Sequence, residues 1–534
     1  MIRNLAALGA VVWLTTLLFF YVQINRSSNG VPEEVMQKWE GALNSLNKVR
    51  EQNEELKRLV EQERAETNAL KSSIISLSIN SADPKRNAAA EEPLDLIPTI
   101  PELSSSPSRE SEIARRELDN QIQEMFYYIH GLKSSDFNEK TKNVATEQLL
   151  SVLAASSHLE HADNAPEARK KAIQKIRERV VKALDKLQNP DHCKKARALI
   201  CDLEKECGFG CELHHVTYCA ITAFATNRML VLKRDGKEEV TNGETVVKFH
   251  QNARERVLNI GIIDTLSSKP GFLPLAVPEQ LVDDMTKYHS IPSALFVGFF
   301  IEYLMRPNDV LKKELATAEK SVPFSEGPIV GLQVRRTDKI GTEAAYHGVN
   351  EYMEWAEHWF QVEERRHGAN LTRRVFIASD DPTVVPETKK NYPAYQVYGS
   401  TDIAKTAQLD SRYTDASLLG VVTDIVLLSK VDYIVCTFSS QVCRTAFELK
   451  QPTGKDDGTK FHSMDDIYYF GGQQPNNVIA VESHEKNNDK EISFRKGDKI
   501  GIAGNHWDGF SLGTNRRTGQ NGLFPSYKVN LQNL

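Results

Sequence analysis

Residues 328–334 read PIVGLQV, and the polar run RRTDK follows immediately at residues 335–339. The apolar run is short, rich in branched side chains and bounded by a proline and by charges, which predicts a buried strand. Residues 375–378 and 433–436 are further short apolar runs, and each also ends in a polar cluster. Stretches with a helical pattern separate the three runs. This alternation is typical of an α/β fold with a Rossmann-type parallel sheet, which we expect within residues 191–474.

The polar clusters at the strand ends are the first candidates for a functional site. Ligands of open parallel sheets bind beyond the carboxyl ends of the strands, where residues 335–339, 379–382 and 437–440 would lie. An arginine at a strand end can hold a diphosphate with paired hydrogen bonds. Ser439 and Ser440 precede a predicted helix, and free N–H groups at a helix start also favour phosphate. The sequence therefore predicts a site for a nucleotide diphosphate.

Two basic residues and one acidic residue carry this prediction further. Arg335 and Arg336 are neighbours, so we expect one to face phosphate and the other to brace the fold. From spacing alone, a pair that is only solvated or salt-bridged remains the alternative. Glu343 lies eight residues after Arg335, and a carboxylate there can take a hydroxyl proton during sugar transfer. The acidic pairs at 380–381 and 465–466 lack the Asp-x-Asp arrangement often used to hold a metal, and they predict caps or turns.

The segment from 478 to 529 carries motifs that together look like an SH3 domain, a small five-stranded barrel. These motifs are VIAV, EISF, KGD, WDG and GLFPSY. Ordinary SH3 domains bind proline-rich peptides in an aromatic groove, and Trp507 and Tyr527 match that groove. Glu482-Ser483-His484 stand where tyrosines are usual, and His506 replaces the first tryptophan. We therefore expect a structural or glycan-contact role.

The N-terminus predicts a membrane anchor. Residues 5–22 are apolar, carry no charge and are about long enough to span a hydrocarbon core. Arg3 precedes them, which favours a short cytosolic tail and a lumenal body. Two N-glycosylation acceptors, Asn25 and Asn370, agree with a lumenal body. A buried N-terminal helix is the alternative.

Helical patterns fill most of the chain between this anchor and the sheet. Apolar residues from 35 to 76 recur with heptad spacing, which predicts a coiled coil; a single amphipathic helix lying on the body is the alternative. Residues 81–111 are rich in Pro, Ser and acidic residues and predict a flexible stem. Two further helices are predicted near 147–159 and 165–187, and long helices of this kind predict a homodimer.

Composition sets the remaining limits. The 534 residues carry a net charge of −6, so no strong field for nucleic acid is expected. Seven cysteines lie between Cys193 and Cys443, and disulfides in an oxidising compartment fit them better than a zinc site. The predicted parts are a cytosolic tail (1–4), a transmembrane signal anchor (5–22), a stem with the coiled coil and a linker (23–110), a helical dimerisation region (111–190), the α/β body (191–474) and the SH3-like module (475–534).

Four strings resemble motifs of the eukaryotic N-glycan core α1,6-fucosyltransferases. They are VRRTDKIGTEAA (334–345), CTFSSQVC (436–443), FHSMDDIYYFGG (461–472) and NHWDG (505–509). The resemblance implies a GT-B-like body in a Golgi membrane protein of type II. It also implies transfer of L-fucose from GDP-β-L-fucose to O6 of the innermost GlcNAc of an N-glycan, with inversion. No cofactor or metal is implied.

The resemblance also assigns roles to residues. Glu343 would be the base, coupled to Lys339, and Arg335 would hold the diphosphate. The implied GDP-fucose contacts are Arg335, Arg336, Asp424 (to guanine) and Ser440. The implied acceptor contacts are Asp338, Asp465, Asp466, Tyr469, Gln473 and His506. The implied disulfides are Cys201–Cys219, Cys207–Cys211 and Cys436–Cys443, which leaves Cys193 as the candidate free thiol.

The chain departs from the family pattern at two places. Gln333 stands where the family usually has a histidine, and the stretch 230–256 is short and weakly matched. Two other functions stay open at this point. One is a fucosyltransferase with another acceptor, such as a chitin oligosaccharide or a protein hydroxyl. The other is a non-enzymatic membrane tether that uses the SH3 module as an adaptor.

Overall fold

The computed structural model describes residues 107–132, 138–204, 207–233, 247–248, 255–262, 277–337, 345–408, 411–468 and 477–531. The predicted anchor at 5–22 and the coiled coil at 35–76 lie outside these residues. So do five predicted site residues: Asp338, Lys339, Glu343, Tyr469 and Gln473. Among the helices of the described part of the chain, none combines the length and the apolar character needed to cross a membrane.

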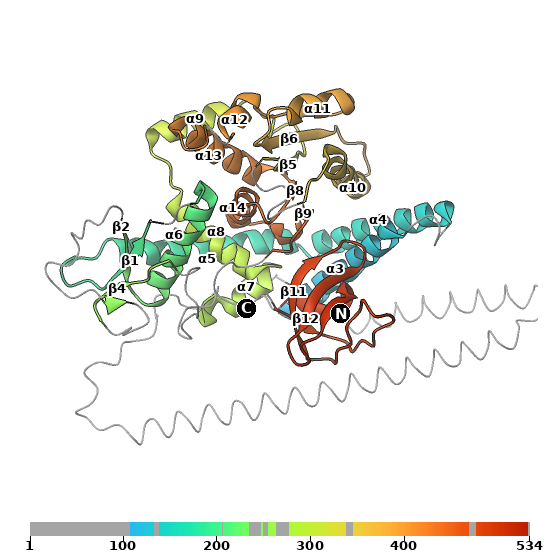
Figure 1. Cartoon of the computed structure of the whole chain (residues 1–534), viewed down its shortest axis with the longest axis horizontal. Helices are drawn as coiled ribbons and strands as arrows, with labels where there is room; N and C mark the ends of the chain where they lie inside the picture. The colour runs from blue at the N-terminus through green and yellow to red at the C-terminus, as the bar shows by residue number, and fades with distance from the viewer. Residues whose placement is uncertain are drawn as a thin grey trace, which may run out of the picture. The chain divides into compact units, whose positions relative to one another are not determined.

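Three long helices open the described part of the chain (Figure 1): α3 (Arg109–Gly131), α4 (Glu139–Ala162) and α5 (Ala165–Gln188). Ser108 and Asn138 accept hydrogen bonds from backbone N–H groups of the first turns of α3 and α4, which is why these helices begin there. Helix α4 begins well before the predicted residue 147. Helix α5 ends just before Asn189-Pro190, as predicted, because proline cannot continue the helical hydrogen bonds.

A first parallel sheet follows these helices. Its strands are β1 (Ala198–Asp202), β2 (Met229–Lys233), β3 (Val247–Lys248) and β4 (Val257–Asn259), in the order β2-β1-β4-β3. The helices that come with it are α6 (Phe209–Ala225), α7 (Glu279–Tyr288) and α8 (Pro292–Leu304). Buried apolar residues of α5, α6, α7 and α8 form one continuous core.

A second parallel sheet contains the predicted strands. Its strands are β5 (Val330–Val334), β6 (Arg374–Ser379), β7 (Gln396–Tyr398), β8 (Tyr433–Cys436) and β9 (Phe461–Ser463), in the order β7-β6-β5-β8-β9. The helices of this part are α9 (Asp309–Glu319), α10 (Val349–His367), α11 (Val384–Asn391), α12 (Thr401–Thr406), α13 (Asp415–Lys430) and α14 (Gln441–Lys450). The strand order reverses between β5 and β8, and such a switch point is where open α/β sheets bind ligands.

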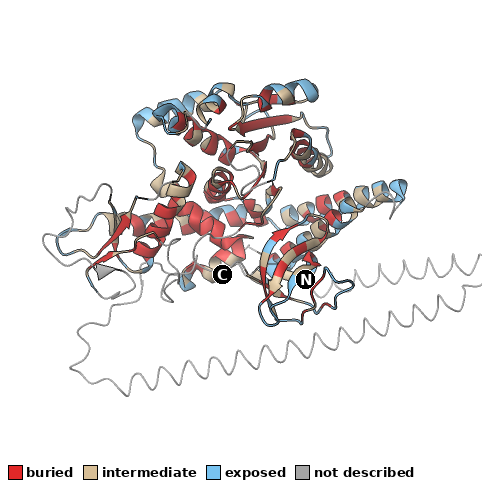
Figure 2. Ribbon diagram, in the orientation of Figure 1, coloured by how far each residue is buried: buried red, intermediate tan, exposed pale blue. Residues whose placement is uncertain are grey.

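Alternating residues of the strands pack on opposite faces of this second sheet, which Figure 2 shows to be buried. Val330, Leu332 and Val334 belong to a core with helices α10 and α11. Ile434 and Cys436 belong to a separate core with α13 and α14. Two parallel sheets, the second with helices on both faces, confirm the α/β class and the GT-B-like body.

The C-terminal module is an antiparallel five-stranded sheet with strand order β13-β12-β11-β10-β14. Its elements are β10 (Asn477–Ala480), β11 (Lys499–Asn505), β12 (Phe510–Asn515), β13 (Asn521–Pro525), the short helix η4 (Ser526–Lys528) and β14 (Val529–Leu531). Helix α3 packs against this module. A Cβ atom on Gly509 would lie only 2.9 Å from Cβ of Tyr128, so a glycine is required at this contact.

Candidate functional site

Asp380 organises the carboxyl ends of the two central strands. Asp380 follows β6 and is 4% exposed. Its Oδ2 lies 3.3 Å from Nε of Arg335. Oδ1 accepts a 2.8 Å hydrogen bond from the backbone N–H of Arg336, and Oδ2 accepts from the hydroxyl and the N–H of Thr337. We call Arg335, Arg336, Thr337 and Asp380 the Asp380 cluster. The sequence predicted a cap or turn at Asp380, whereas the residue anchors the neighbouring strand end.

The two adjacent arginines have different partners. Arg336 Nη1 lies 2.8 Å from Glu387 on α11 and 3.5 Å from Asp381, and its guanidinium lies over the ring of Tyr346. Arg335 pairs with Asp380 and its side chain is 18% exposed, against 8% for Arg336. Arg336 therefore braces the fold, and Arg335 is the more exposed of the two arginines at the sheet edge.

Polar side chains without partners gather at the same edge. Ser440 begins α14, and its hydroxyl oxygen is buried without a hydrogen-bond partner among the described residues. The same holds for the hydroxyls of Thr437 and Ser439, and for Oε1 of Gln333 on β5. Because β5 and β8 are adjacent strands, these atoms line the switch point of the sheet. Buried hydroxyls normally find partners, so such a group indicates a place that a polar ligand fills.

Asp424 lies on α13 and is buried. Burial raises the pKa of its carboxyl group well above the usual value. A carboxyl group in such a place favours a neutral state or a ligand that donates hydrogen bonds to it.

The predicted acceptor residues Asp465 and Asp466 follow β9. Oδ1 of Asp465 accepts hydrogen bonds from the hydroxyl of Ser463 (3.0 Å) and from the N–H groups of Asp466 (2.6 Å) and Ser439 (3.4 Å). Asp465 thus holds the loops after β8 and β9 together. Burial, and then the charge of Asp465, raise the pKa of Asp466 to about 6.

The SH3-like module reaches the same loop. A Cβ atom on Gly504 of β11 would lie 3.9 Å from Oδ1 of Asp466. His506 follows two residues later and is exposed, and its N–H donates to the carbonyl of Phe510. The structure therefore brings the backbone near His506 to the Asp465–Asp466 loop, although 38 residues or more separate them in sequence.

The tryptophan of the SH3-like groove points to the body. Trp507 has a positive φ of 56°, and its ring centroid lies 5.1 Å from Tyr127 of α3 and 4.7 Å from His462 of β9. We call Tyr127, His462 and Trp507 the SH3 junction. Gln121 of α3 also donates to the carbonyl of Tyr527. Helix α3 therefore contacts residues that an ordinary SH3 domain offers to proline-rich peptides.

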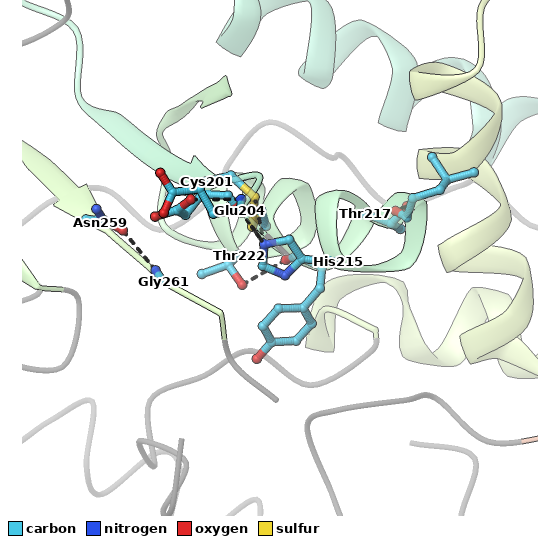
Figure 3. Close-up of a disulfide and its surroundings, with 11 residues drawn as sticks. Cys201, Glu204, His215, Thr217, Thr222, Asn259 and Gly261 are labelled. Atoms are coloured by element: carbon cyan, nitrogen blue, oxygen red, sulfur yellow. Dashed lines mark hydrogen bonds between the residues drawn. A yellow bond between two sulfur atoms is a disulfide. The ribbon is translucent and has the colours of Figure 1, made fainter. Parts of the chain in front are cut away.

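Three disulfides are present, and they are the predicted pairs Cys201–Cys219, Cys207–Cys211 and Cys436–Cys443. Cys193 is exposed and not bridged, also as predicted. Figure 3 shows His215 beside the first bridge, with Nε2 3.6 Å from Sγ of Cys201. The bridge ties β1 to α6, and the third disulfide ties the end of β8 to the first turn of α14.

Sequence reasoning missed two contributors to the site. The sequence marks Asp380 only as part of an acidic pair, and its position directly after a strand is the signal that it offers. Arg412 offers no such signal; its Nη2 lies 3.2 Å from the hydroxyl of Thr337. Arg412 belongs to an irregular segment before α13, and no local pattern indicates that it reaches the Asp380 cluster.

Comparison with known proteins identifies the two parts. Residues 1–469 match a family model described as alpha-(1,6)-fucosyltransferase N- and catalytic domains, and residues 480–530 match a variant SH3 domain. The chain is 50% identical to an alpha-(1,6)-fucosyltransferase of Caenorhabditis elegans, covering 99% of this chain and 98% of the relative. It is 35% identical to the Drosophila melanogaster protein of the same name, covering 97% and 94%. A solved mutant of Arabidopsis thaliana FUT1 in complex with GDP is 12% identical over 54% of this chain and 77% of that chain, with a TM-score of 0.31.

Proposed function

Because this chain belongs to the alpha-(1,6)-fucosyltransferase family, we propose that it moves L-fucose from GDP-β-L-fucose to O6 of the innermost GlcNAc of N-glycans, with inversion. The observation that carries the donor side is the Asp380 cluster. It places Arg335 at the switch point of the sheet, next to buried hydroxyls without partners on the loop after β8.

Arg335 is proposed to bind the diphosphate. The bond between fucose and diphosphate breaks with a build-up of negative charge on the leaving oxygen, and a fixed guanidinium stabilises that charge. Asp380 lies 3.3 Å from Nε of Arg335 and orients this side chain, and the guanidinium is proposed to bind phosphate oxygens with paired hydrogen bonds. The hydroxyl of Ser440 and the start of α14 add donors, and Asp424 is proposed to accept the N–H groups of guanine.

Glu343 is proposed to be the base that takes the proton of the GlcNAc O6 hydroxyl, coupled to Lys339. Both residues follow Arg335 within eight residues of sequence. Attack by O6 on the face opposite the diphosphate gives inversion. The acceptor is proposed to contact Asp338, Asp465, Asp466, Tyr469, Gln473 and His506. Chemistry of this kind uses charge stabilisation by Arg335 in place of a metal, so we propose that transfer needs no metal.

The setting of the enzyme is proposed from the helices and the N-terminus. Large apolar side chains are exposed on α3 and α4, namely Ile113, Leu118, Met125, Tyr128, Val144, Val152 and Leu159. Exposed apolar side chains on long helices support an interface between subunits, and we propose a homodimer through these helices. The uncharged apolar residues 5–22 support a type II anchor in the Golgi membrane, with a lumenal body.

A mass-spectrometric transfer assay tests the proposal. The purified chain is incubated with GDP-fucose, a GlcNAc-terminated biantennary N-glycopeptide and EDTA, beside a Glu343→Gln variant. One fucose on the innermost GlcNAc, made in EDTA and lost in the variant, is the expected result. Chitin oligosaccharides are tested in parallel, and transfer to them alone would refute the proposed N-glycan acceptor. Loss of transfer in EDTA that added metal restores would refute metal independence.

A further inference from the structure

A second cluster of chemically active side chains lies where helix α3 meets helix α10. His130 is in the last turn of α3, and Glu354 and His358 lie one turn apart on α10. One ligand atom from each residue lies within 4.8 Å of the other two. Positions i and i+4 share a face of a helix, so α10 presents a carboxylate and an imidazole together toward the imidazole of α3.

We infer that His130, Glu354 and His358 form a site for a divalent transition-metal ion of the zinc type, which links α3 to α10. Two imidazoles and one carboxylate are a ligand set that zinc uses, with a water in the fourth position. Nothing in the proposed fucose transfer uses these three residues, and the inference does not depend on that function.

The distances fit such an ion. Nε2 of His130 lies 3.4 Å from Oε1 of Glu354, which is longer than a good hydrogen bond. It is close to the separation of about 3.3 Å between two ligands of a tetrahedral ion with bonds of about 2.0 Å. The ligand atom of His358 lies within 4.8 Å of the ligand atoms of His130 and Glu354.

His358 offers an unpaired ring nitrogen at this place. Nδ1 of His358 is buried without a hydrogen-bond partner among the described residues. Buried polar atoms normally find partners, so this nitrogen indicates a place for a further polar contact. An imidazole nitrogen is among the ligands that zinc binds in proteins.

Two charged residues near the three proposed ligands already have other partners. Glu357, which lies beside His358 in sequence, is already paired with Arg373 and Tyr395. The ammonium of Lys142 donates to the carbonyls of His130 and Leu132 at the end of α3. The side chain of Glu354 is 52% exposed, so an ion can enter from solvent and keep a bound water.

An ion here would stabilise more than two helices. Phe126 and Trp355 form an apolar wall, with ring centroids 5.2 Å and 5.4 Å from His358. Trp355 stacks on His462 at 3.7 Å, and His462 belongs to the SH3 junction. The metal link would therefore hold the helical region, the second sheet and the SH3-like module in one arrangement.

The test uses the full chain without a polyhistidine tag, freed of metal by a chelator that is then removed. Zn²⁺ is titrated by calorimetry, stoichiometry is measured by elemental analysis, and Co²⁺ is used as a visible probe. We expect one Zn²⁺ per chain with micromolar or tighter affinity, and a rise in melting temperature of about 2–5 °C. His358→Gln and His130→Gln each weaken binding by at least about a hundredfold and abolish the Co²⁺ absorption.

Two matched variants separate this site from others. His158→Gln removes a histidine of α4 whose Nε2 contacts the carbonyl of Arg366 near the end of α10, and it retains the bound ion. Cys193→Ser removes the exposed thiol and also retains it. No binding at micromolar Zn²⁺ by the folded wild-type chain overturns the inference, and so does binding that both His→Gln variants preserve. The fucose-transfer rate per folded enzyme is measured alongside, so failure of the metal site is distinguishable from failure of the proposed reaction.

Discussion

The Asp380 cluster and the SH3 junction hold two sides of the same body by different means. The Asp380 cluster comes from the ends of adjacent strands β5 and β6, and a buried carboxylate orients it with hydrogen bonds and an ion pair. The SH3 junction joins α3, β9 and the C-terminal module through ring contacts. The first is a rigid polar centre within one sheet, and the second is an apolar contact between parts. Donor chemistry is expected to depend on the first, and acceptor position on the second.

The largest expected effect is that of Arg335→Ala. Without this guanidinium, no arginine at position 335 stabilises the negative charge that builds up on the departing diphosphate, so kcat/KM falls about a thousandfold. Arg335→Lys recovers only a small part, because an ammonium cannot bind a phosphate with paired hydrogen bonds. Transfer kinetics and GDP binding by calorimetry measure both. Arg306→Ala, which removes an exposed arginine, is the control, and an Arg335→Ala enzyme with nearly normal activity would remove the donor assignment.

Asp380→Asn is expected to have the next largest effect. The amide fills the same space but carries no charge, so Arg335 loses its orienting partner and kcat/KM falls about a hundredfold. Loss of one member of this buried pair also lowers the free energy of unfolding by about 3 kcal/mol. Asp381→Asn is the matched control, because it makes the same change at the next residue. Asp381 lies 3.5 Å from Arg336, and its Oδ1 accepts a hydrogen bond from the N–H of Thr383. Equal losses in both variants would show that the Asp380 cluster has no special role.

Trp507→Ala tests the SH3 junction. Loss of the ring contacts with Tyr127 and His462 frees the module to shift, so the KM for the glycopeptide rises about tenfold while GDP affinity stays unchanged. Tyr527→Ala removes the other groove aromatic, which is 42% exposed, and is expected to leave both values alone. A fall in GDP affinity in Trp507→Ala would mean that the two sides of the body are coupled.

The same contrast explains what the sequence could predict. Residues 328–334 and their polar continuation reveal a strand and a binding edge, because both lie in one short segment. The disulfide pairs and the SH3-like module followed from motif resemblance. Asp380 was undervalued because its partner, Arg336, lies 44 residues earlier in the chain. The SH3 junction joins Tyr127 to His462 and to Trp507, which lie 335 and 380 residues later in the chain, and no local pattern encodes such contacts.

The smallest expected effect is the pH dependence of acceptor binding that Asp466, which follows β9, would cause. Burial and then Asp465 raise the pKa of Asp466 to about 6, while Arg444 opposes the rise. The ionised fraction of Asp466 therefore falls as pH drops from 7 to 5. If ionised Asp466 accepts hydrogen bonds from sugar hydroxyls, the KM for the glycopeptide rises by up to about tenfold over that range. Asp466→Asn is expected to have a higher KM at pH 7 and a flat profile.

Stability should change in the opposite direction at the same residue. A carboxyl group whose pKa is raised on folding stabilises the fold fully below its unfolded pKa, and this contribution is lost as pH rises through about 6. Asp466→Asn is therefore expected to melt at a higher temperature than the wild type at pH 7, although it binds the acceptor less well. Asp489→Asn, at a fully exposed position of the module, serves as the control and changes neither property. Replacing a residue that is kept for binding at a cost in stability makes the fold more stable. If Asp466→Asn instead loses both stability and acceptor affinity at pH 7, the main role of Asp466 is to support the loop.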